Sequence, residues 1–136
     1  MSFVRRIVVG TEFSPDSQRA VAYAGELARA LSAELIVLHV DEKAEFVPGS
    51  DLAEAERAAD CAGMDAAVRE LVKGGVRARG AVRPGLPAQG LCDAASTEHA
   101  DLLVVGTQGR GCRVLGGVTE RVLRDAPCPV LVIRNP

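Results

Sequence analysis

The chain has 136 residues, a net charge of −2 and 48% hydrophobic residues, as expected for one globular domain covering residues 1–136. The near-neutral charge excludes the basic surface with which nucleic-acid-binding proteins hold phosphates. No apolar run approaches the roughly 20 residues of a membrane-spanning helix. Because only 3% of the residues are aromatic, we expect a core of Val, Leu, Ile and Ala, which is typical of a parallel sheet covered on both faces.

The first half of the chain alternates strand and helix patterns. Residues 5–9 are a short β-branched run that ends at Gly10. The segment Ser14-Pro15-Asp16 that follows has the cap, the first-turn proline and the acidic residue of a helix start. Residues 34–40 form a second apolar strand. An Ala-rich helix is predicted over 51–73, with the stripe Leu52, Ala55, Ala59, Ala62 and Ala66 facing the core.

The second half continues the alternation. Residues 76–82 alternate small residues with arginines, which predicts a half-exposed edge strand. A helix over 87–99 and a central strand over 101–105 follow. A glycine-rich loop over 106–117, a short helix to about residue 125 and a last strand over Val130–Ile133 complete the pattern.

The predicted order β-α-β-α-β-α-β-α-β requires parallel strands joined by right-handed crossovers. An edge-like third strand and a central fourth strand predict a five-stranded parallel sheet in the order 3-2-1-4-5, with helices on both faces. This is a flavodoxin-like winding, whose ligands bind beyond the carboxyl ends of the strands where the order reverses.

Two loops should meet at that point, residues 10–14 and residues 106–111. The second resembles a phosphate cradle, because glycines let backbone N–H groups approach an anion and a helix begins just after it. A tight turn with no ligand explains the same glycines equally well.

Several segments resemble the universal stress protein family. The strings VVGTQGRG, GGVTERVL and APCPVLVIR are similar to its C-terminal signature, and RRIVVGTEFSPDSQRAVAYAGELA and ELIVLHV are similar to its first strand, first helix and second strand. The match covers nearly the whole chain. It implies the same sheet in an adenine nucleotide alpha hydrolase-like fold, a homodimer and a stress-response role, with ATP bound in some members.

The family's nucleotide motif is Gly, two residues, Gly, nine residues, then Gly with Ser or Thr. Gly106 and Gly109 match the first pair, and Gly116 and Gly117 occupy the last pair. Only six residues separate Gly109 from Gly116, and Gly117 stands where the motif has a hydroxyl. Thr119 lies about half a helical turn further, too far around the helix to substitute.

Further binding residues are assigned by the same resemblance. Glu12 stands where the nucleotide binders carry Asp, and Val40 would lie against the adenine. Arg110 is the best cation for a phosphate, because its guanidinium matches the phosphate oxygens. The implied set is Gly10, Thr11, Glu12, Val40, Val105, Gly106, Gly109, Arg110, Gly116, Gly117 and Val118.

No catalytic residue or metal ligand is predicted, because no nucleophile has a matching base and the four cysteines follow no zinc spacing. Cys61 and Cys92 are expected to be small packing residues on helices, and Cys112 is the one candidate for redox sensitivity. His39 is expected to be a hydrogen-bonded core histidine. Without an apolar segment after the charged residues 1–6, no signal peptide is expected, which predicts a cytoplasmic protein.

Three functions follow. The first is a stress-response regulatory module with a degenerate ATP site. The second is a family member that binds no nucleotide and acts through protein contacts. The third, a phosphate-hydrolysing enzyme, ranks last because the chain lacks a Walker lysine and its metal-binding hydroxyl. A homodimer is predicted through Val130–Ile133, since an apolar edge strand favours pairing with a second copy.

Overall fold

The computed structural model describes residues 3–42, 51–107 and 116–134, with only the backbone described for residues 51–57. The elements are β1 (Arg6–Gly10), α1 (Pro15–Leu31), β2 (Glu34–Asp41), α2 (Asp51–Lys73), β3 (Arg77–Pro84), α3 (Pro87–Thr97), β4 (Leu102–Gly106), α4 (Gly117–Asp125) and β5 (Val130–Ile133). The strands form one sheet in the order β3-β2-β1-β4-β5, and every neighbouring pair is parallel. The predicted fold class and strand order are confirmed.

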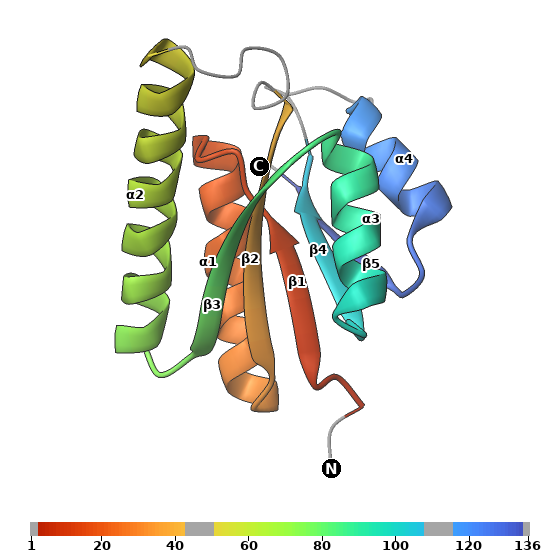
Figure 1. Ribbon diagram of the computed structural model, residues 1–136. Helices are drawn as coiled ribbons and strands as arrows, with labels where there is room; N and C mark the ends of the chain where they lie inside the picture. Colours follow the sequence, from red (N-terminus) through yellow and green to blue (C-terminus); the bar gives the residue numbers. More distant parts are fainter. Residues whose placement is uncertain (1–2, 43–50, 108–115, 135–136) are drawn as a thin grey trace.

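The helices cover both faces of the sheet. Figure 1 shows α3 and α4 together on one side and α1 on the other. The side chains of α2 join those of α1 in one apolar cluster with the sheet, whereas α3 and α4 contribute to a second cluster. Each central strand is therefore buried on both faces, which explains why β1, β2 and β4 read as continuous apolar runs.

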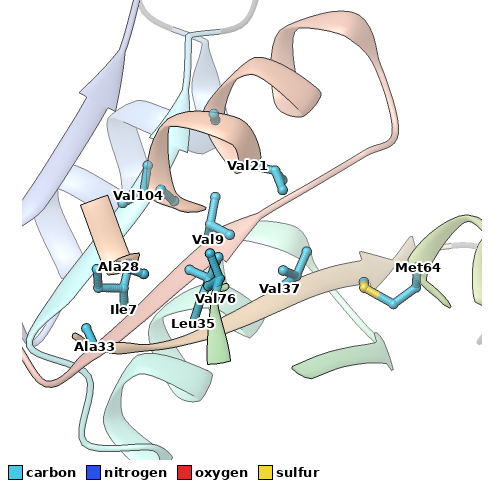
Figure 2. Close-up of a cluster of buried hydrophobic side chains, with 12 residues drawn as sticks. Ile7, Val9, Val21, Ala28, Ala33, Leu35, Val37, Met64, Val76 and Val104 are labelled. Atoms are coloured by element: carbon cyan, nitrogen blue, oxygen red, sulfur yellow. The ribbon is translucent and has the colours of Figure 1, made fainter. Parts of the chain in front are cut away.

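Successive residues of the central strands alternate between the two clusters. Ile7 and Val9 of β1 lie in the cluster under α1 and α2, which Figure 2 shows, whereas Val8 between them lies in the cluster under α3 and α4. All three are fully buried. The alternation follows from the two-residue period of a strand. In the part of the chain that the structure describes, no helix is long and apolar enough to cross a membrane.

The predicted inner face of α2 is wrong. Ala59, Ala62 and Ala66 are exposed, and the helix instead packs through Met64, Val68 and Leu71. The reason is that alanine gains little from burial, so the larger apolar side chains decide how the helix is rotated. The side chains of Leu52 and Ala55 lie outside the described residues. Gly80 of β3 lets α2 come close, since a Cβ there would lie 2.5 Å from the Met64 sulfur.

The side chain of Asp101, just before β4, is hydrogen-bonded to the backbone at the start of β1. Its Oδ2 accepts hydrogen bonds from the backbone N–H groups of Arg5 at 2.8 Å and Arg6 at 3.1 Å. These two bonds lower the pKa of the Asp101 carboxyl, since they favour its ionised form. The pairing holds the central strands in the register that brings Gly10 and Gly106 to the same edge of the sheet.

Replacing Asp101 with Asn should lower the free energy of unfolding by about 0.5–1 kcal/mol at pH 7. The reason is that hydrogen bonds to a neutral amide oxygen are weaker than the same bonds to an ionised carboxylate. A lowered pKa in the folded state means that ionisation stabilises the fold. That stability is complete above the pKa of the unfolded chain, about 3.9, and is lost as the pH falls through the folded value. Urea unfolding should therefore show a difference between the two proteins at pH 7 that becomes smaller at a pH below about 3.9. An equal difference at both pH values would contradict this account, and Asp93→Asn, an exposed change on α3, is the control.

Candidate functional site

The strand order reverses at β1 and β4, whose carboxyl ends, Gly10 and Gly106, lie on adjacent strands. In an open parallel sheet this is the position at which ligands bind. Gly10 allows Leu91 of α3 to pack closely there, since a Cβ would lie 2.9 Å from a methyl group of that side chain. The two loops predicted to meet therefore do leave from neighbouring strand ends.

The loop after β1 is held by hydroxyl groups. The Ser17 hydroxyl accepts the N–H groups of Glu12 at 3.0 Å and Ser14 at 3.1 Å. The Ser14 hydroxyl in turn accepts the N–H of Ser17 at 3.3 Å, which completes a capping box and confirms Ser14 as the cap of α1. Thr11 is buried, and its hydroxyl accepts the N–H of Phe13 at 3.0 Å. The side chain of Glu12 is exposed.

Ser17 was missed as a site residue, although its spacing three residues after Ser14 is a recognisable variant of the capping box. Replacing it with Ala should lower the free energy of unfolding by about 1–3 kcal/mol, because the N–H groups of Glu12 and Ser14 lose their acceptor. Chemical denaturation measures the change, and Gln18→Ala, an exposed position on the same helix turn, is the control. A Ser17 variant as stable as the Gln18 variant would contradict the role assigned to this hydroxyl.

The start of α4 differs from that of α1. Gly116 is its N-cap in an extended conformation, φ −63° and ψ 157°, and no side chain of the described residues caps the helix. Gly117 is exposed, and a Cβ built on it would meet nothing within 4 Å. Among the described residues, the first N–H groups of α4 thus have no hydroxyl acceptor of the kind that Ser14 and Ser17 provide at α1, which leaves this end suited to an anion.

Thr119 ties α4 to β4. The residue is 2% exposed, and its hydroxyl donates to the carbonyl of Gly106 at 2.9 Å. This bond brings the glycines of 116 and 117 beside the end of β4. It also commits the Thr119 proton to the backbone, consistent with the inference that Thr119 does not replace the hydroxyl missing at Gly117. Gly109, Arg110 and Cys112 lie outside the described residues.

The three valines of the predicted set belong to the apolar cluster under α3 and α4. Val40 and Val105 are buried, and Val118 is half-buried. Val40 packs directly on α3, where a Cβ on Gly90 would lie 2.7 Å from its Cγ2. These side chains form an apolar layer beneath the carboxyl edge, so their contact with a ligand would come through the backbone or the edge of the side chain.

His39 is hydrogen-bonded on both ring nitrogens, as predicted. Nδ1 lies 2.8 Å from the carbonyl oxygen of Thr11, and Nε2 lies 3.1 Å from Oδ2 of Asp60 in α2. Asp60 was missed by sequence reasoning, because the pair joins two elements 21 positions apart and no local pattern marks it.

The cysteines divide by burial. Cys61 is exposed on α2, which corrects its assignment as a packing residue and follows from the rotation of that helix. Cys92 and Cys128 are half-buried, and desolvation raises the pKa of both thiols, which disfavours the reactive thiolate. Among the described residues no group of three or more His, Cys, Asp or Glu side chains could hold a metal ion.

Residues 4–134 match the family model described as the universal stress protein family. The chain belongs to this family. A universal stress protein of Thermus aquaticus is 33% identical over 135 residues, an alignment covering 96% of this chain and 98% of the relative. The family resemblance seen in the sequence is thus confirmed.

Two solved universal stress proteins share the fold. One is a crystal structure in complex with cAMP, 30% identical, with a TM-score of 0.80 and 98% of both chains covered. The other, from Archaeoglobus fulgidus in complex with dAMP, is 23% identical with a TM-score of 0.72, covering 98% of this chain and 99% of that one. At 23% identity, the similarity to the Archaeoglobus fulgidus protein concerns the fold alone.

Proposed function

We propose that this universal stress protein is a cytoplasmic regulatory module that binds an adenine nucleotide, with ATP as the expected ligand, and catalyses no reaction. The observation that carries the proposal is the uncapped start of α4, held beside Gly106 by the Thr119 hydroxyl at the point where the strand order reverses. Backbone N–H groups at such a helix end bind phosphate oxygens. The relative solved with cAMP supports an adenine nucleotide as the ligand class.

Phosphates would bind at α4 and not at α1. The N–H groups at the start of α1 already have hydroxyl acceptors in Ser14 and Ser17, whereas α4 has no side-chain cap among the residues that the structure describes. The base would then lie toward the loop of Thr11 and Glu12 and above Val40. The site is degenerate, because Gly117 lacks a hydroxyl and the loop before it is short, so we expect weaker binding than in a member with the complete motif.

The alternative is a member that binds no nucleotide and acts through protein contacts. The same two departures favour it. Mass spectrometry of the purified protein under non-denaturing conditions, followed by calorimetric titration with ATP, separates the two proposals. A co-purified adenine nucleotide or saturable ATP binding supports the nucleotide site. If no adenine nucleotide binds at millimolar concentration, the protein-contact function replaces it.

A homodimer through β5 is part of the proposal. All four residues of β5 are apolar and only half-buried, and the strand lies at the edge of the sheet. An apolar edge favours antiparallel pairing with a second copy across a two-fold axis. Light scattering should give the mass of a dimer at micromolar concentration, and Val132→Lys should shift it to the monomer, because a charge would be buried in the new interface. A monomeric wild-type protein would refute the pairing.

A further inference from the structure

His39 lies between the loop after β1 and helix α2. Its ring is bonded to the Thr11 carbonyl on one side and to the Asp60 carboxylate on the other, at 2.8 and 3.1 Å. The side chain of His39 is 13% exposed and that of Asp60 is 26% exposed, so solvent weakens neither contact as it would at the surface. The ring bridges a backbone group of the candidate site and a side chain of a peripheral helix.

The chemistry of the two partners defines the hydrogen bonds. A backbone carbonyl can only accept, so Nδ1 carries a proton and donates it to Thr11. An ionised carboxylate also only accepts, so the contact with Asp60 requires a proton on Nε2. Through these two contacts the ring connects the backbone of Thr11 with the side chain of Asp60 in α2.

Helix α2 also contacts the loop through Phe13. Phe13 has a φ of +61°, an unfavourable conformation for a residue with a side chain. Its ring lies 4.9 Å from the His39 ring, centroid to centroid, and a Cβ on Gly63 of α2 would lie 3.3 Å from it. Two side chains of the site, His39 and Phe13, are thus packed against one stretch of α2, residues 60–63, which stabilises the strained turn.

We propose that His39 is a positioning residue, which holds the Thr11–Phe13 loop in its binding conformation through Asp60 and so couples the nucleotide site to α2. This inference rests on the proposed function, because it assigns the loop to the base of the ligand. Coupling is reciprocal: if α2 holds the loop for the ligand, the ligand also holds α2. Binding should then slow amide exchange in α2 around residues 58–68, a surface that could report occupancy of the site to a partner.

Asp60→Ala removes the helix end of the bridge from a partly exposed position and is expected to leave the fold intact. It should weaken adenosine binding about fivefold or more and abolish the ligand-induced protection of α2. Affinity for inorganic triphosphate should not change, because that probe contacts only the start of α4. If Asp60 had a purely structural role, its loss would not lower the affinity for adenosine while leaving the affinity for triphosphate unchanged.

Three further variants sharpen the test. Asp65→Ala removes an exposed carboxylate from the same helix and should behave as the wild type. Asp60→Asn keeps an oxygen acceptor for Nε2 and should restore part of the adenosine affinity. His39→Asn keeps an amide N–H near the position of Nδ1 but cannot reach Asp60, so it should behave like Asp60→Ala. Wild-type adenosine affinity together with wild-type protection in Asp60→Ala would overturn the proposal.

Failure of the proposed function gives a different result. If the wild-type protein binds neither adenosine nor ATP, the nucleotide site is refuted, and the bridge is judged from amide exchange without ligand. The amides of Glu12 and Phe13, which bond within the loop, should then exchange about fivefold faster or more in Asp60→Ala than in Asp65→Ala. Equal rates would show that His39 does not position the loop.

Discussion

Replacing Gly117 with Ser is expected to tighten ATP binding by about tenfold to a hundredfold. The serine restores a hydroxyl at the start of α4, and one hydrogen bond to a charged acceptor is worth about 1.5–3 kcal/mol. The structure has room for it, since a Cβ on Gly117 meets nothing within 4 Å. Adenosine affinity should hardly change, because adenosine has no phosphate to accept the new bond. Calorimetric titration of both ligands measures the two effects.

Gly117→Ala is the matched control, because it adds the Cβ and stiffens the backbone without supplying a hydroxyl. Its ATP affinity should stay within about twofold of the wild type. Equal gains in the Ser and Ala variants would assign the effect to the stiffer helix start. If the wild type binds ATP well and Ser adds nothing, the shortened loop has built a different phosphate site, and the residue assignment at Gly116 and Gly117 is wrong.

Replacing Leu103 with Ala should lower the free energy of unfolding by about 2–5 kcal/mol. Leu103 is fully buried in β4, between β1 and β5, in the cluster under α3 and α4. The change removes apolar contacts and leaves a cavity that close-packed neighbours fill only in part. Because Gly106 ends the same strand, ATP affinity should fall as well.

Leu123→Ala is the control for this truncation, since Leu123 of α4 is 44% exposed. It should change the free energy of unfolding by less than about 0.5 kcal/mol. Urea unfolding at one protein concentration holds the concentration-dependent contribution of dimer dissociation equal in the two variants. If both variants lose a similar free energy of unfolding, the exposure of Leu123 in the monomer does not predict the cost of its truncation. That result would be expected if the surface around Leu123 is covered in a dimer.

The order of elements and the sheet topology could be read from the sequence, because both depend on local patterns. Continuous apolar runs such as residues 34–40 predicted strands buried on both faces, and the arginines of residues 76–82 predicted the edge strand β3. The cap at Ser14 followed from a preference that acts within three residues. The glycines at 106 and 116–117 indicated the candidate site from the sequence, and their role in binding stays a prediction.

Only the tertiary structure decided the rotation of α2 and the contacts that hold the site. The alanine stripe could not predict which face of α2 is buried, because the cost of exposing an alanine is small. The larger side chains of Met64, Val68 and Leu71 pack against the sheet instead. The bridge from Thr11 through His39 to Asp60, and the bond from Thr119 to Gly106, join residues far apart in the chain. Periodicity and capping act over a few residues, whereas such bonds depend on distances that exist only after the sheet and its helices have packed.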